Sequence, residues 1–242
     1  MDDDYLYFKF RKIDKHLIES LVSRELYFAK PDTLNDPFDC RLDLEKSFTH
    51  AASSATDAQA TKLKEALSSP KLLKQWETQF SSVGICSFSL CSDETLLWSH
   101  YADQHKGVCL LYRFSQLFLI DSKNRILGVS KVAYENDRLT EWLKSASLDQ
   151  NDPDNFRNEL TKIYLTAKSP AWKYEKEARI IRFDPGPFPV PHGCLEQICF
   201  GLETPRTDVD LVTKLAMSYH KGIKFCRMIR NESDFGIRMH VM

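Results

Sequence analysis

The stretch SVGICSFSLCSDETLLWSHYADQHKGVCLLYRF, residues 82–114, is densely hydrophobic and changes its apolar period twice. The spacing predicts a strand at 83–90, a helix at 95–104 and a second strand at 107–114. This segment therefore predicts a fold that mixes strands and helices.

The same two periods continue on either side of this stretch. Strands are predicted at 5–11, 172–183, 195–200, 223–230 and 235–241, and helices at 137–147, 154–168 and 207–219, with a further helix capped by Asp14. The elements follow no regular βαβ rhythm. That order favours an α+β fold with mixed, mainly antiparallel sheets flanked by helices.

Residues 45–80 differ in composition from their surroundings. They are rich in Ala, Ser, Thr, Lys and Gln, and helices fit at 55–67 and 70–79. Because this segment has few apolar residues, we expect it to be a helical insertion on the surface of a single domain that spans residues 1–242.

Composition limits the class of protein. The formal net charge of −1 gives no global attraction to nucleic acid or to an acidic membrane, although a local basic patch stays open. Seven cysteines without a CxxC pair predict buried thiols in a reducing compartment and no zinc site. The Met-Asp-Asp-Asp start differs from a signal peptide, and no apolar run is long enough for a membrane span. We therefore expect a cytoplasmic location and no membrane partner.

Two carboxylates are the first candidates for chemistry. If residues 172–183 form one strand, Glu175 and Glu177 share a face. One could stabilise a developing cation while the other orients a nucleophile. The alternative is a solvated ladder of Lys and Glu side chains.

Other candidate residues lie on earlier elements. Ser87 and Ser89 end an apolar strand face, as expected at a pocket rim, but no G-x-S-x-G elbow surrounds them. On the predicted helix, Trp98 and Tyr101 fall near one stripe, whereas His100 and His105 are poorly spaced for a shared metal.

Two further features have both a functional and a structural interpretation. Arg11, on the first strand, suits a phosphate or an amide carbonyl, or is simply an exposed strand residue. The Asn-Asp-Pro-Phe-Asp sequence at 35–39 could hold a cation or cap a helix, or be a rigid turn. The roles of Asp36 and Asp39 stay open at this point.

Several uncommon short sequence motifs occur in this chain in a defined order. They are NDPFD at 35–39, WSHYA at 98–102 followed by HKGVC at 105–109, and WKYEKEAR at 172–179. Together they resemble a bacterial family known only as a domain of unknown function, DUF2971, over roughly residues 5–205. The family name supplies no chemistry.

A more distant resemblance is to ADP-ribosyltransferases. These enzymes keep an early Arg or His, a Ser-x-Ser strand and a Glu-x-Glu strand in that order, as Arg11, Ser87-Phe88-Ser89 and Glu175-Lys176-Glu177 stand here. The transferases carry Thr where this chain has Phe88. The resemblance implies a split-sheet core, NAD as substrate, and an effector of the toxin or phage-defence type that modifies a protein or nucleic acid.

The resemblance also implies roles for individual residues. Glu177 would stabilise the oxocarbenium-like transition state, and Glu175 would orient the acceptor. Arg11 would contact the NAD phosphates or the ribose. Ser87 and Ser89 would hold the ribose and the glutamate, and Trp98 or Tyr101 would stack on nicotinamide.

Two other functions remain open from the sequence. Asp36, Asp39, His100 and Glu177 could surround a divalent metal in a nuclease or another hydrolase. Alternatively, the chain is a non-catalytic module that binds an antitoxin or a defence partner. In that case Trp98, Trp172 and Phe38 would be core residues, and Glu175 and Arg179 would form ion pairs.

Overall fold

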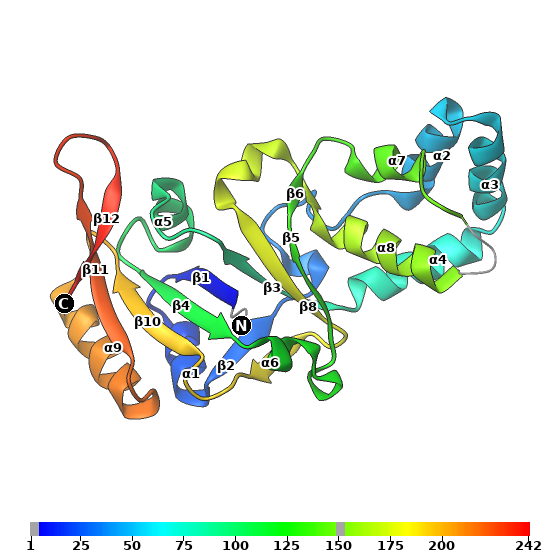
Figure 1. Cartoon of the computed structure of the whole chain (residues 1–242). Helices are drawn as coiled ribbons and strands as arrows, with labels where there is room; N and C mark the ends of the chain where they lie inside the picture. Colours follow the sequence, from blue (N-terminus) through cyan, green and yellow to red (C-terminus); the bar gives the residue numbers. More distant parts are fainter. Residues whose placement is uncertain (1–4, 149–152) are drawn as a thin grey trace.

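A computed structural model describes residues 5–148 and 153–242. Its centre is a sheet of eight strands (Figure 1). In order across the sheet these are β12 (Ile237–Val241), β11 (Lys224–Arg230), β10 (Leu195–Phe200), β4 (Val108–Phe114), β1 (Tyr5–Arg11), β3 (Gly84–Ser89), β8 (Glu177–Arg182) and β5 (Ile126–Lys131). Neighbouring strands are antiparallel except β10 and β11. The predicted α+β class with a mixed, mainly antiparallel sheet is confirmed.

The sheet is weakly joined in its middle. Strand β1 pairs with β4 along its whole length, but with β3 only at Phe8 and Ser89. Instead of further ladder bonds, the Lys9 ammonium donates to the carbonyl oxygen of Ser87 at 2.9 Å. Strands β1 and β3 therefore separate beyond this point and leave room for side chains between them.

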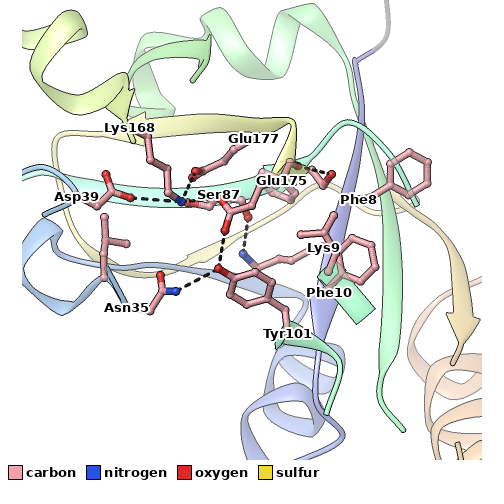
Figure 2. A pocket seen from close by; sticks show the side chains of 14 residues that line it. Phe8, Lys9, Phe10, Asn35, Asp39, Ser87, Tyr101, Lys168, Glu175 and Glu177 are labelled. Carbon is pink, nitrogen blue, oxygen red and sulfur yellow. Dashed lines mark hydrogen bonds and ion pairs between the residues drawn. The ribbon is translucent and has the colours of Figure 1, made fainter. Parts of the chain in front are cut away.

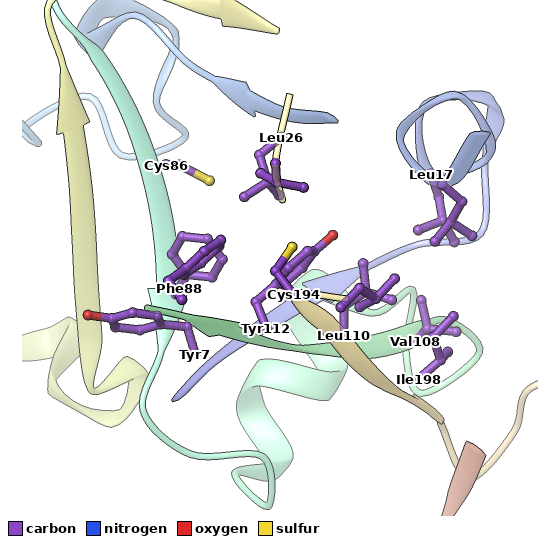
Figure 3. Packing of buried hydrophobic residues seen from close by; sticks show 14 of the residues in the cluster. Tyr7, Leu17, Leu26, Cys86, Phe88, Val108, Leu110, Tyr112, Cys194 and Ile198 are labelled. Atoms are coloured by element: carbon purple, nitrogen blue, oxygen red, sulfur yellow. The ribbon is translucent and has the colours of Figure 1, made fainter. Parts of the chain in front are cut away.

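Helices cover both faces of the sheet. On one face α1 (Lys15–Ser23) and α9 (Arg206–Tyr219) pack over a core that includes Leu17, Leu110 and Ile198 (Figure 3). On the other face lies α5 (Thr95–Tyr101), whose Trp98 ring meets Phe10 edge-on at 5.2 Å between centroids. The smaller elements are α6 (Gln116–Ile120), the 3₁₀ turns η1 (Pro31–Thr33) and η2 (Ser122–Asn124), and the two-stranded pairs β2 (Glu25–Phe28) with β9 (Gly186–Pro189) and β6 (Ala133–Tyr134) with β7 (Ala167–Lys168).

The segment expected as a surface insertion is part of a helical lobe with its own core. The lobe, at one end of the molecule in Figure 1, consists of α2 (Leu44–Ser54), α3 (Asp57–Leu67), α4 (Pro70–Ser81), α7 (Arg138–Leu143) and α8 (Pro153–Thr166). Phe48, Leu63 and Phe80 are buried in it. The expectation of a surface insertion with little core was wrong, because α7 and α8 supply the apolar surface that covers these helices.

Two predicted elements are shorter than expected. The helix predicted to reach residue 104 stops at Tyr101, because residues 103–105 adopt left-handed backbone conformations. The strand predicted at 172–183 begins only at Glu177. Residues Pro170–Glu175 instead form the 3₁₀ turn η3, capped by the Ser169 side chain and closed by left-handed Lys176.

The seven cysteines are free, and six of them are buried, which confirms the prediction of buried thiols. Within residues 5–148 and 153–242, no helix has the length and apolar character needed to cross a membrane.

Gly107 allows a close approach between two backbones, and we expect its replacement by Ala to destabilise the fold. A Cβ at this position would lie 2.3 Å from the carbonyl oxygen of Arg11 and 2.9 Å from that of Ala102. Relief of such overlap costs roughly 1–3 kcal/mol. Urea denaturation should show this loss for Gly107→Ala but not for Gly128→Ala, where nothing lies within 4 Å. Equal stability of both variants would contradict the packing described for this turn.

Candidate active site

A cavity of about 170 Å³ lies where β1 and β3 separate. Phe8, Phe10 and Leu97 form apolar parts of its wall. Its polar lining consists of Ser89 and of eight residues labelled in Figure 2, namely Lys9, Asn35, Asp39, Ser87, Tyr101, Lys168, Glu175 and Glu177. These residues come from β1, the 35–39 turn, β3, α5, β7, η3 and β8, so the fold gathers them from positions between 9 and 177.

Glu175 ends η3 and is held by two side chains at the cavity. Its carboxylate accepts a hydrogen bond from the Tyr101 hydroxyl at 2.5 Å and one from the Lys168 ammonium at 2.5 Å. Ser89 fixes the backbone beneath it, since its hydroxyl donates to the Glu175 carbonyl at 2.7 Å. Burial raises the pKa of Glu175 above its usual value, and this effect outweighs the opposing influence of Lys168.

Glu177 begins β8 and has a different electrostatic environment. It accepts from Arg179 Nε at 2.8 Å and from Lys168 Nζ at 2.9 Å, and Ser87 hydrogen-bonds it as well. Burial alone would raise its pKa. The Arg179 guanidinium, with Lys168, outweighs burial and holds the pKa of Glu177 at about 2.

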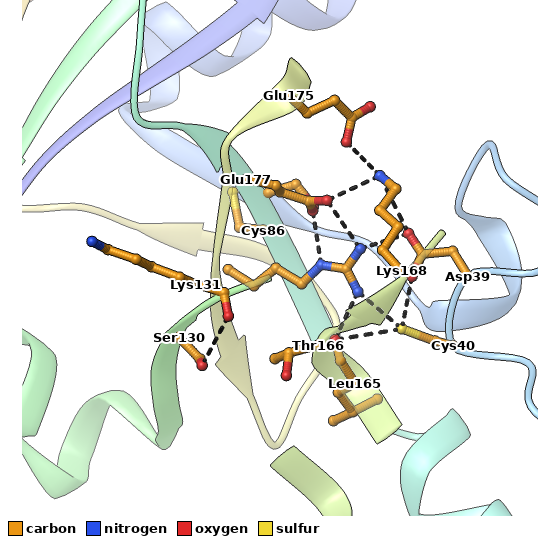
Figure 4. A network of polar contacts seen from close by, with 12 residues as sticks. Asp39, Cys40, Cys86, Ser130, Lys131, Leu165, Thr166, Lys168, Glu175 and Glu177 are labelled. Atoms are coloured by element: carbon orange, nitrogen blue, oxygen red, sulfur yellow. Dashed lines mark hydrogen bonds and ion pairs between the residues drawn. The ribbon is translucent and has the colours of Figure 1, made fainter. Parts of the chain in front are cut away.

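Arg179 joins three parts of the chain in a buried network; its partners Asp39, Leu165 and Glu177 are labelled in Figure 4. Its guanidinium, which is 0% exposed, donates to Glu177, to Asp39 at 2.5 Å and to the Leu165 carbonyl at 2.7 Å. It also contacts the Cys40 sulfur at 3.1 Å. The 35–39 turn and the end of α8 are thus fixed to the central sheet through one side chain.

The charges of this network do not balance. Asp39, Glu175 and Glu177 contribute three negative charges, whereas Lys168 and Arg179 contribute two positive ones. One excess negative charge therefore remains at the cavity when all five groups are ionised. Two carboxylates whose pKa values move in opposite directions can serve separate roles, one as an ionised stabiliser and the other as a proton acceptor.

The depressed pKa of Glu177 predicts an acid-sensitive fold. A carboxyl whose folded pKa lies near 2, below its ordinary 4.5, stabilises the fold above pH 4.5 and loses that effect as pH falls toward 2. We expect this loss to be on the order of 3 kcal/mol. Chemical denaturation at several pH values should show a steeper acid decline for the wild-type chain than for Glu177→Gln. Parallel declines would show that Glu177 titrates normally in the folded state.

The structure brings together most, but not all, of the residues singled out from the sequence. Ser87, Ser89, Tyr101 and both glutamates line the cavity. The sequence pattern had suggested that the two glutamates share one strand face. In the structure both carboxylates instead bind the Lys168 ammonium, and Glu175 lies in η3. Neither is solvated, because Glu175 is 5% and Glu177 is 4% exposed.

Arg11 and Trp98 lie elsewhere. Arg11 lines a separate hollow of about 920 Å³ beside α1 and β2, and its strand neighbour Lys9 reaches the cavity instead. Trp98 is a core residue, 0% exposed, whose indole nitrogen donates to the Ser92 carbonyl at 2.8 Å. Neither side chain is placed to meet a ligand in this cavity.

The residues proposed as metal ligands separate in the same way. Asp39 and Glu177 belong to the buried network, whereas His100 is exposed and contacts the Tyr101 and Tyr174 rings. Asp36 is buried, and its carboxylate accepts from the backbone N–H of Phe38 at 2.9 Å. In the described part of the chain, no cluster of three or more His, Cys, Asp or Glu side chains is arranged to hold a metal ion.

Sequence reasoning missed Lys168, Lys9 and Asn35. Lys168 is a buried lysine between two glutamates, and both carboxylates raise its pKa in spite of burial. The sequence TAKSPAW offers one indirect signal, a single charge inside an apolar segment that ends at a proline. The side-chain amide of Asn35 donates to the Tyr101 hydroxyl at 3.1 Å. The sequence had marked its turn at 35–39 as a candidate, but without a role for Asn35 itself.

Comparisons with known proteins agree with part of this description. Residues 97–180 match the model of a family described as "Protein of unknown function (DUF2971)". No curated protein and no solved structure matches the chain. The match is shorter than the resemblance predicted over residues 5–205, yet it includes Tyr101, Lys168 and both glutamates. Residues 97–180 are therefore similar to the DUF2971 family of proteins of unknown function.

Proposed function

We propose that this cavity breaks the nicotinamide–ribose bond of NAD and transfers ADP-ribose to a macromolecular acceptor. The observation that carries the proposal is the convergence of Ser87, Glu175 and Glu177 on one cavity. Ser87 on β3 and Glu177 on β8 lie on neighbouring strands of the sheet, Glu175 ends η3 just before β8, and β1 is the other neighbour of β3. Two of the three motifs that resemble ADP-ribosyltransferases, Ser-x-Ser and Glu-x-Glu, thus meet at this cavity, whereas Arg11 lies outside it.

The charges of the cavity suit this reaction. When the bond between ribose C1′ and the nicotinamide nitrogen breaks, the electron pair leaves with the nitrogen and positive charge develops on the ribose. The ionised carboxylate of Glu177 and the excess negative charge of the network stabilise that cation. The acceptor atom then bonds to C1′, and its proton passes to Glu175, whose raised pKa suits it as a base.

The size of the cavity indicates which end of NAD enters it. Ligand pockets commonly measure roughly 300–1,000 Å³, so about 170 Å³ accommodates only a part of a dinucleotide. Phe8, Phe10 and Leu97 offer apolar surface to a flat ring, and the Tyr101 hydroxyl lies beside Glu175. The nicotinamide end of NAD suits this combination of apolar side chains and a carboxylate.

A non-catalytic module is the second candidate function. It is favoured by Arg179, whose contacts with Asp39, Glu177 and the Leu165 carbonyl fasten the helical lobe to the sheet. A metal-dependent hydrolase receives less support, because the Lys168 ammonium lies among the carboxylates of Asp39, Glu175 and Glu177.

Incubation with NAD labelled in its adenylate phosphate and a cell extract separates these functions. We expect label in the macromolecular fraction, with and without a chelator. Hydrolysis that is lost on chelation and is indifferent to NAD would support the metal-dependent alternative. If neither reaction occurs while the folded chain captures a partner protein, the non-catalytic module is supported.

A further inference from the structure

A row of aromatic rings leads away from the cavity. From Tyr101 it continues to His100, to Tyr174 and to Trp172, with ring centroids 6.3, 6.1 and 6.0 Å apart. Tyr101 hydrogen-bonds Glu175, so one end of the row touches the proposed catalytic carboxylates. His100 is exposed, and Tyr174 and Trp172 are half-buried, so the row runs along the surface.

A further aromatic ring is displayed on the 35–39 turn. Phe38 is 79% exposed, although the hypothesis of a structural module had assigned it to the core. Its backbone N–H is bound by Asp36, and the next residue, Asp39, is fixed by Arg179 and lies 3.6 Å from Lys168. The Lys168 ammonium in turn lies 5.2 Å from the centre of the Trp172 ring. We name Phe38, His100, Trp172 and Tyr174 the aromatic rim.

Two lysines interrupt the aromatic residues of the rim. Lys173 and Lys176 are exposed and lie on or directly after η3, which also carries Trp172 and Tyr174. In the sequence Trp-Lys-Tyr-Glu-Lys, Lys173 stands between two rings and Lys176 follows Glu175. The two ammonium groups supply local positive charge beside the rings, which a net charge of −1 for the whole chain permits.

We propose that the aromatic rim stacks the bases of a single strand of nucleic acid, and that one of these bases is the acceptor at Glu175. The identity of the acceptor rests on the proposed function, whereas binding of the strand does not. Stacking uses the flat faces that every base offers, and lysines attract the phosphates between them. In the transfer, an N–H of the base loses its proton to Glu175 and its nitrogen bonds to ribose C1′.

The rim discriminates between classes of acceptor. In a duplex the base faces are covered by their neighbours, so only unpaired or extruded bases can stack on side chains. At the rim, the exposed cations of Lys173 and Lys176 attract the phosphates of a nucleic acid, whereas the excess negative charge of the network lies inside the cavity. Nucleic acid satisfies both the rings and these charges.

Binding is tested by the fluorescence anisotropy of a labelled single-stranded DNA of about 12 nucleotides, with full-length Glu177→Gln to prevent turnover. We expect tighter binding than for the same sequence in a duplex. In this background, Phe38→Ala and Trp172→Ala should each weaken binding roughly 5- to 150-fold, since stacking contributes about 1–3 kcal/mol per base. Tyr27→Ala, which removes a ring that is 60% exposed on β2, should leave the affinity unchanged.

The charge contribution has its own readout. Replacing Lys173 and Lys176 by Ala should reduce the dependence of binding on salt by roughly 0.7 in logarithmic slope for each lost phosphate contact. Because Phe38 is exposed, its variant separates loss of binding from loss of folding. The proposal would be overturned if Phe38→Ala left the affinity for the single strand unchanged. It would also be overturned if Tyr27→Ala weakened binding as much as Phe38→Ala does.

The experiment also separates the two proposals. If NAD is consumed but labels a protein and no single strand binds, the proposed function stands and the aromatic rim has another partner. If the strand binds through the rim while NAD stays intact, the binding site stands and the proposed reaction fails.

Discussion

The Arg179→Met variant is expected to lose about 3–5 kcal/mol of folding free energy. The guanidinium is fully buried and donates to Glu177, to Asp39 and to the Leu165 carbonyl. Methionine fills similar space but leaves two buried carboxylates with Lys168 as their remaining cation. The penalty comes mainly from these uncompensated charges and less from the lost attraction.

Thermal unfolding measures this effect directly. For a chain of this length, each kcal/mol shifts Tm by roughly 2–4 °C, so a fall of about 6–20 °C is expected. The matched control is Arg230→Met, which removes an exposed partner of Glu203 and should cost at most about 1 kcal/mol. A similar Tm for both variants would show that the buried network does not hold the helical lobe to the sheet.

The Glu177→Gln variant is expected to reduce kcat for nicotinamide release about 10³-fold with little change in KM. The substitution keeps the shape of the side chain but removes the charge that stabilises the developing cation. A role in the transition state therefore affects kcat, whereas a role in substrate binding would affect KM.

Folding must be controlled for in this comparison, because Glu177 also pairs with Arg179 and Lys168. Circular dichroism measures the Tm of the variant. Turnover of wild type and variant is then compared at a temperature well below that Tm, where both are folded. Glu203→Gln, which replaces an exposed glutamate outside the cavity lining, is the matched control and should retain wild-type turnover. Retained turnover in folded Glu177→Gln would remove Glu177 from the chemistry.

Elements with strong periodicity could be predicted from the sequence. The alternation at 5–11 predicted β1, and Asp14 caps α1 as expected, with its carboxylate accepting from the Leu17 backbone N–H at 2.9 Å. In these places, local pattern and capping agree with the tertiary structure, so one sequence signal sufficed.

Other elements were beyond local reasoning. The 3₁₀ turn η3 replaced a predicted strand because Pro170 and left-handed Lys176 fix a turn that an alternating pattern conceals. Most helices of the lobe were predicted, but their common core was missed, because the residues that cover α2 to α4 belong to α7 and α8, more than 50 residues further along the chain.

Some residues of the site could likewise be predicted from the local sequence, and others could not. Ser87, Tyr101, Glu175 and Glu177 could be named because they occur in recognisable words. Lys168 could not, since its importance arises from three carboxylates brought together by the fold. The assignment of Arg11 followed the order of motifs, but the charged residue of β1 that lines the cavity is Lys9.

The central claim is that the cavity between β1 and β3 breaks the nicotinamide–ribose bond of NAD. Chromatographic measurement of free nicotinamide, after incubation of the purified wild-type chain with NAD and either single-stranded nucleic acid or a protein extract, tests it most directly. We predict that nicotinamide accumulates in step with the loss of NAD, that a chelator has no effect, and that Glu177→Gln abolishes the release. NAD that stays intact with the folded wild-type chain and both kinds of acceptor would contradict the claim.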